Sequence, residues 1–178
     1  MANNVEYTNN SVQVTAAIKR AVRNWLLEAG GELQARIVRN SRTRTGQTKG
    51  SYQYKVDEDN GVCVVGSALE NAIWEEFGTG EYAVNNDGRK KGWWIKVGNG
   101  RGEIPLSVVD KYKWVKYRYE NGDIGHGKKL RRGGKRGQLA YVFTYGKKPN
   151  KPMQRAFEAL KEPLERRLER LLKDETEG

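Results

Sequence analysis

The stretch Asn71-Ala72-Ile73-Trp74-Glu75-Glu76-Phe77-Gly78-Thr79-Gly80-Glu81-Tyr82-Ala83 combines apolar, acidic and turn-forming residues within a short part of the chain. Its apolar residues predict an element that packs against a core. The glycines that follow let the backbone turn where a side chain would obstruct it. We therefore expect a structural signature of the fold, in which the Trp and the Phe anchor a sheet to a helix. Its members are Trp74, Glu76, Phe77, Gly78, Thr79 and Gly80.

The glutamates of this stretch raise the question of catalysis or metal binding. Glu75 and Glu76 are adjacent, so their side chains point apart in any regular structure, and glutamates beside such a turn more often accept hydrogen bonds from backbone amides. One histidine, His126, and one cysteine, Cys63, are too few for a zinc site or a His or Cys triad. We expect no catalytic residue, no metal and no cofactor. A nuclease with carboxylates on a metal is the enzyme alternative.

Upstream of the signature, the apolar positions from Val14 to Val38 fall three and four residues apart, which predicts a long amphipathic helix. The pair Gly30-Gly31 lies inside it and predicts a kink or a close helix contact there, with a break into two helices as the alternative. Residues 1–10 are polar and are expected to form a loose arm.

A β-hairpin is predicted between this helix and the signature. Residues 51–56 alternate like a strand, Asn60-Gly61 supplies the positive φ angles of a tight turn, and residues 62–66 form the partner strand. Cys63 lies among valines in that partner strand, where a buried structural role is expected.

Downstream of the signature, β-prone stretches alternate with glycine-rich turns. Strands are expected at 93–97, 112–119 and 139–145, followed by an amphipathic helix from Met153 that Pro163 should kink. The chain is expected to form a single domain, 1–178, with segments at 1–10 (arm), 97–138 (basic Gly-rich insertion) and 164–178 (charged C-terminal extension).

The charge is concentrated in one region. The chain carries 33 Lys and Arg against 22 Asp and Glu, with a pI near 9.7, and residues 86–140 hold fifteen of these basic and five of the acidic residues. Cations among Trp93, Trp94, Trp114 and Tyr117 have the composition of a nucleic-acid surface without base-specific readout. An intersubunit contact or a solvated loop is the favoured interpretation, and nonspecific contact with DNA is the alternative. The candidate contact residues are Arg89, Lys90, Lys91, Lys128, Lys129, Arg131, Arg132, Lys135 and Arg136.

The sequence has no run of eighteen apolar residues and no secretion signal, so a protein that is soluble and not exported is expected. With a single cysteine no internal disulfide is possible, which suits a reducing compartment.

Several motifs, taken in order, resemble the small siphophage neck and tail-completion proteins, which are minor structural proteins at the head-tail junction. The resemblance covers most of the chain and departs from the family pattern at 97–138, which is longer and more basic. The motifs are Ala29-Gly30-Gly31, Arg44-Thr45-Gly46 with Ser51, Val65-Gly66, the stretch from Ala72 to Gly80, Gly88 to Trp93, and Phe143 to Met153 closing on Ala156-Phe157.

The resemblance implies an α+β fold, in which an antiparallel sheet carries the long N-terminal helix and a C-terminal helix, together with a long basic insertion. It also implies a non-enzymatic virion structural protein that helps to join head to tail in a long-tailed bacteriophage. Its expected partners are further copies of itself in a homo-oligomeric ring, for which a hexamer would fit, and the neighbouring connector and tail-terminator or tail-tube proteins. The implied location is the neck or tail of the virion, after assembly in the host cytoplasm. Basic loops in the ring lumen would touch genomic DNA without reading its sequence. A nonspecific DNA-binding protein that uses the basic aromatic insertion is the alternative.

Overall fold

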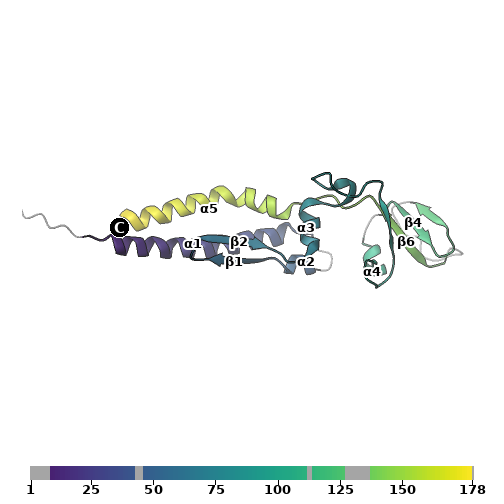
Figure 1. Cartoon of the computed structure of the whole chain (residues 1–178), viewed down its shortest axis with the longest axis horizontal. Coiled ribbons are helices and arrows are strands. Elements are labelled where there is room, and N and C mark those ends of the chain that lie inside the picture. The colour runs from purple at the N-terminus through teal and green to yellow at the C-terminus, as the bar shows by residue number, and fades with distance from the viewer. Residues whose placement is uncertain (1–8, 43–45, 112–113, 127–136, 178) are drawn as a thin grey trace, which may run out of the picture. The chain divides into compact units, whose positions relative to one another are not determined.

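The computed structural model describes residues 9–42, 46–111, 114–126 and 137–177. Its helices and antiparallel strands confirm the α+β prediction (Figure 1). The strands form two separate sheets rather than one. The elements in chain order are α1 (Ser11–Asn40), α2 (Gln47–Gly50), β1 (Gln53–Asp57), β2 (Val62–Gly66), α3 (Glu70–Phe77), the 3-10 turn η1 (Gly80–Tyr82), β3 (Trp93–Lys96), α4 (Leu106–Val109), β4 (Lys116–Tyr119), β5 (Ile124–His126), β6 (Leu139–Thr144) and α5 (Pro152–Glu177).

The chain divides into two compact units. Unit 1 comprises residues 1–72 and 151–178, and unit 2 comprises residues 73–150. Unit 2 is therefore inserted between the hairpin and the last helix of unit 1. The sequence-based expectation of a single domain concerns cooperative folding of the whole chain, and it stays a prediction.

Unit 1 is built on two long helices that run side by side in opposite directions, α1 and α5 (Figure 1). The indole Nε1 of Trp25 donates to the carbonyl of Leu164 at 3.0 Å, and Arg167 Nη1 lies 2.6 Å from Glu32 Oε1. The hydrogen bond and the charge of Glu32, followed by those of Glu28, raise the pKa of the Arg167 guanidinium. Helix α5 continues through Pro163, and Leu164 is buried. The expected C-terminal extension at 164–178 is thus wrong for its first part, which packs on α1.

The hairpin β1–β2 packs against α1 at Gly30. Helix α1 is one continuous helix of 30 residues, so the alternative of a break into two helices does not occur. A Cβ atom on Gly30 would lie 2.5 Å from Tyr54 Cδ2 and 2.7 Å from Cys63 Sγ. Close packing therefore occurs at Gly30, but against the β1–β2 hairpin rather than against another helix, and Gly31 has no such contact. Burial against α1 raises the pKa of the Cys63 thiol. Elsewhere in unit 1, a buried hydrophobic core is formed by Ile37, Tyr52, Ala72 and Ala156.

The two glycines of α1 provide a matched pair of variants. Gly30→Ala is expected to lower the free energy of unfolding by about 1 to 3 kcal/mol, because its methyl group enters occupied space. Gly31→Ala meets nothing within 4 Å and should instead stabilise the helix by up to about 1 kcal/mol. Urea denaturation followed by far-ultraviolet circular dichroism measures both. Equal effects of the two substitutions would contradict the close contact at Gly30.

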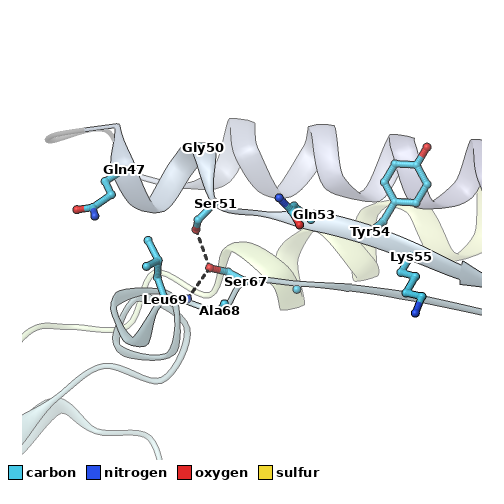
Figure 2. A pocket seen from close by; sticks show the side chains of 10 residues that line it. Gln47, Gly50, Ser51, Gln53, Tyr54, Lys55, Ser67, Ala68 and Leu69 are labelled. Atoms are coloured by element: carbon cyan, nitrogen blue, oxygen red, sulfur yellow. Dashed lines mark hydrogen bonds between the residues drawn. The ribbon is translucent and has the colours of Figure 1, made fainter.

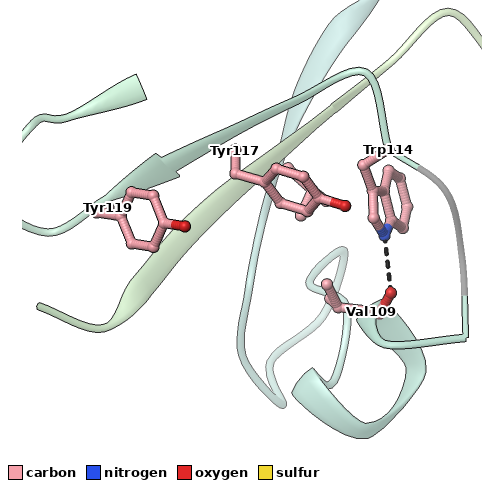
Figure 3. Close-up of a cluster of buried hydrophobic side chains, with 5 residues drawn as sticks. Val109, Trp114, Tyr117 and Tyr119 are labelled. Atoms are coloured by element: carbon pink, nitrogen blue, oxygen red, sulfur yellow. Dashed lines mark hydrogen bonds between the residues drawn. The ribbon is translucent and has the colours of Figure 1, made fainter. Parts of the chain in front are cut away.

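Unit 2 contains a four-stranded antiparallel sheet in the order β3-β6-β4-β5. One face of this sheet packs on a buried cluster formed by Val109, Trp114, Tyr117, Tyr119 and Val142 (Figure 3). The indole of Trp114 donates to the carbonyl of Val109 at 3.0 Å and ties α4 to the sheet. Because Trp114 and Tyr117 lie in this core, the prediction that they stack on nucleic-acid bases is wrong. The residues expected to form a basic insertion supply most of this core.

Candidate functional site

Residues 75–81 of the signature stretch form hydrogen bonds with residues 145–150, which lie at the C-terminal end of unit 2. Thr79 N donates to the carbonyl of Lys147 at 2.9 Å, and Lys147 N donates back to Thr79 Oγ1 at 2.9 Å. Asn150 bonds to Glu75 twice: its backbone N–H donates to the Glu75 carbonyl at 2.8 Å, and its amide donates to Glu75 Oε1 at 3.0 Å. We call these paired segments, residues 75–81 and 145–150, the clasp. It holds together the points where the chain enters and leaves unit 2.

The exposure of α3 is the reverse of the predicted pattern. Trp74 and Phe77 are 46% and 48% exposed, so the prediction that they anchor the core is wrong. Ala72 is buried as expected, at 3%, and Glu75 and Glu76 are buried in place of the aromatic residues, at 2% and 7%. These positions are three and four residues apart and share one side of the short helix. The clasp selects that side, because Glu75 lies where it can accept hydrogen bonds from Asn150.

The third glutamate has the role expected for it. Glu81 Oε1 accepts a hydrogen bond from the backbone N–H of Lys91 at 2.9 Å, as predicted for a carboxylate beside a glycine turn. Of the neighbouring candidate contacts, Lys90 and Lys91 are exposed, and the Arg89 guanidinium lies 5.7 Å from the ring centre of Trp93. Arg89 thus makes a cation–π contact with Trp93 that stabilises the fold.

The second face of the four-stranded sheet carries basic and aromatic side chains in two rows. Residues paired directly across neighbouring strands lie on the same face, as do residues two apart along a strand. The pairing places Trp94, Phe143, Lys116 and His126 in one row and Lys96, Tyr141, Arg118 and Ile124 in the other. We call these eight residues the basic-aromatic face. Their strands are separated by up to 50 residues of sequence, so only the pairing brings them together.

The basic-aromatic face is open to solvent and its aromatic residues support one another. Trp94 is 37% exposed, Arg118 and His126 are exposed, and the others are exposed or half-buried. The rings of Trp94 and Phe143 meet edge to face with centres 5.2 Å apart. Lys116 Nζ lies 5.5 Å from the ring centre of Phe143. These contacts limit the movement of the side chains before any ligand arrives.

One cation of the face is paired. Lys96 Nζ lies 2.8 Å from Glu103 Oε1, and Gly100 N donates to Glu103 Oε2 at 2.9 Å. The hydrogen bond from Lys96, and then that from the Gly100 backbone, lower the pKa of the Glu103 carboxyl, and the same hydrogen bond raises the pKa of Lys96. The positive charge that the face offers a ligand therefore comes chiefly from Lys116 and Arg118.

Six of the predicted contact residues, Lys128, Lys129, Arg131, Arg132, Lys135 and Arg136, lie outside the described residues. The basic-aromatic face as a whole could not be predicted from the sequence. The alternation of basic and aromatic residues along 116–119 was visible, yet it did not reveal which neighbours the strand would have.

Unit 1 contains an open groove of about 570 Å³ beside the start of β1 and the end of β2 (Figure 2). Inside it Ser51 Oγ and Ser67 Oγ are 2.6 Å apart, and Ser67 Oγ accepts from Leu69 N at 3.1 Å. The two hydroxyls are thereby held in hydrogen bonds within the fold. The groove is lined by Gln47, Gly50, Ser51, Gln53, Tyr54, Lys55, Gly66, Ser67, Ala68 and Leu69.

Within the described parts of the chain, no three His, Cys, Asp or Glu residues gather closely enough to hold a metal ion. No helix formed by the described residues has both the length and the apolar character needed to cross a membrane.

Comparisons of the chain with protein-family models, with curated proteins and with solved structures give no significant match.

Proposed function

We propose that this chain is a non-enzymatic structural protein of the virion, which completes the tail or neck of a long-tailed bacteriophage and helps to join head to tail as a homo-oligomeric ring. The order of its motifs supports this proposal through their resemblance to neck and tail-completion proteins. A hexamer is the first stoichiometry to test.

The observation that carries the proposal is the exposed apolar side of α3. Ile73 is 58% exposed, and Trp74 and Phe77 are nearly half exposed. They are spaced i, i+1 and i+4, so they form one continuous surface on the helix. Exposed clusters of large apolar side chains commonly mark protein contacts, and aromatic residues often dominate the binding energy of such contacts. The clasp holds this surface in a defined position, which is what a repeated subunit contact needs.

The proposal predicts that polar substitutions on α3 dissociate the assembly. Trp74→Gln combined with Phe77→Gln should convert oligomers into monomers in light scattering coupled to size exclusion. Because both side chains are half exposed, the circular dichroism spectrum should be retained. Phe157→Gln is the matched control, since Phe157 is 56% exposed and lies on α5.

The wild-type chain provides the decisive outcome. If it remains monomeric alone and does not join tails or connectors supplied to it, the ring proposal fails. In a phage that lacks the protein, electron micrographs should show unjoined heads and tails.

A nonspecific DNA-binding protein that acts outside the virion is the second candidate. The charge of residues 86–140 favours it, because those residues carry fifteen of the basic and only five of the acidic side chains. Duplex DNA affinity should then fall steeply as salt rises. The test is charge reversal of Lys128, Lys129, Arg131 and Arg132. If the affinity for DNA is unchanged in this variant, the insertion does not bind DNA.

A further inference from the structure

We infer that the basic-aromatic face of unit 2 binds single-stranded nucleic acid, with bases on its aromatic half and phosphates on its basic half. This site is separate from the α3 surface and does not depend on ring assembly. The argument rests on three properties of the face: the separation of its residue types, its charge and its rigidity.

Apart from Lys96, which lies on β3 and is paired with Glu103, the basic and aromatic residues occupy different strands. Trp94, Tyr141 and Phe143 lie on β3 and β6, which are neighbours at one side of the sheet. Lys116 and Arg118 lie on β4, which is next in order. Neighbouring strands are about 4.8 Å apart, so cations and rings are within reach of the same nucleotide. A strand of nucleic acid that follows β4 can place its phosphates beside the cations and turn its bases toward the rings.

The charge of the face suits a polyanion. None of its eight members is acidic, and Glu103 neutralises one of its cations, Lys96. Lys116 and Arg118 are two residues apart on one strand, a separation of about 6.8 Å, so they are suited to separate phosphates along one backbone. A duplex can use these cations, because its phosphates are on the outside.

The exposed aromatic side chains distinguish a single strand from a duplex. In a duplex the base faces are stacked on one another and are not available to protein rings. Unpaired bases offer both faces, and stacking on aromatic side chains accounts for much of the affinity of proteins that bind single strands without reading sequence. Trp94, with its ring 37% exposed beside the basic strand, is the best placed residue for this contact.

The face is held rigid by the opposite side of the same sheet. Tyr117 and Val142 alternate with the face residues and point into the buried cluster under α4. On the open side, the rings of Phe143 and Tyr145 meet at 89° with centres 5.3 Å apart. A surface ordered before binding loses less conformational entropy when the ligand arrives.

The test is fluorescence anisotropy of the full-length chain with a labelled twenty-nucleotide oligo(dT) and with a duplex of the same length. We expect tighter binding to the single strand. Trp94→Leu with Tyr141→Leu should weaken single-strand binding roughly 5- to 100-fold and duplex binding little. Lys116→Gln with Arg118→Gln should weaken both and make the salt dependence of single-strand binding shallower by about 1.4 in log–log slope.

Two further variants locate the binding. Arg155→Gln with Lys161→Gln removes the same charge from exposed positions of α5 and should change single-strand affinity less than twofold. Charge reversal of Lys128, Lys129, Arg131 and Arg132 tests the basic segment that follows β5. Circular dichroism and thermal unfolding establish that each variant is folded.

Three results would overturn the inference. Equal affinity for duplex and single strand, with no effect of Trp94→Leu and Tyr141→Leu, would mean that no base stacks on the face. Loss of binding in the charge-reversed variant alone, with Lys116→Gln and Arg118→Gln neutral, would place the contact in 128–136. If the folded chain binds no nucleic acid at all, the inference is wrong, and an acidic protein becomes the partner to test for this face. None of these results bears on the oligomer test at α3, so the two proposals can fail independently.

Discussion

Gly78→Ala is expected to destabilise the protein by roughly 2 to 5 kcal/mol, one of the largest effects of a single methyl group in this chain. Gly78 follows α3 with φ +75°, and its N–H donates to the Trp74 carbonyl at 3.0 Å, which is how a glycine ends a helix. A Cβ atom there would lie 2.7 Å from the Tyr82 carbonyl oxygen and 2.9 Å from that of Lys147. Alanine would therefore strain the backbone and also push the two segments of the clasp apart.

Gly102→Ala separates these two causes. Gly102 has a similar φ of +79°, but a Cβ atom there meets nothing within 4 Å. Only the backbone strain remains, at about 1 to 2 kcal/mol. Guanidinium denaturation followed by tryptophan fluorescence measures both variants. If Gly78→Ala costs no more than Gly102→Ala, the close approach at the clasp does not contribute to stability.

Trp114→Ala is expected to cost about 3 to 5 kcal/mol, because it leaves a large cavity in the core of unit 2. Trp114 is 9% exposed, and its indole hydrogen bond to the Val109 carbonyl is lost in the same substitution. Trp114→Phe should cost less, since it keeps most of the apolar volume and loses the hydrogen bond. Denaturation curves of the purified variants give these differences.

Trp94→Ala provides the matched control for the core tryptophan. Trp94 belongs to the same sheet but lies on its open face, where its ring contact is with Phe143. We expect a loss of about 1 kcal/mol, the usual value of an aromatic pair. A cost equal to that of Trp114→Ala would show that the basic-aromatic face is buried in solution, and it would argue against an open binding surface.

The elements with strong local patterns were predictable. The spacing of apolar residues predicted α1, and Asn60-Gly61 between two alternating stretches predicted the β1–β2 hairpin. The stretches at 93–97 and 139–145 likewise predicted β3 and β6. Each of these signals lies within a few residues of the element that it determines, so no knowledge of distant contacts was needed.

The residues of the functional surfaces were harder to predict, because their environment depends on distant segments. The same alternation along β4 is compatible with either face of the strand being buried. Pairing with β6 and packing under α4 decide that Tyr117 points inward and Lys116 and Arg118 point outward. Without knowledge of that pairing, Trp94, Trp114 and Tyr117 are equivalent candidates for base stacking. The structure shows that Trp114 and Tyr117 are core residues and that only Trp94 of the three is exposed.

The sequence by itself determined the long helices, the hairpin and the positions of the glycine turns, because these follow from local periodicity and backbone preference. Only the tertiary structure decided the orientation of the signature. In α3, apolar and acidic residues alternate around a short helix, and either side is able to face inward. Hydrogen bonds from Asn150, 75 residues away along the chain, select the side of Glu75 for burial and leave Trp74 and Phe77 in solvent.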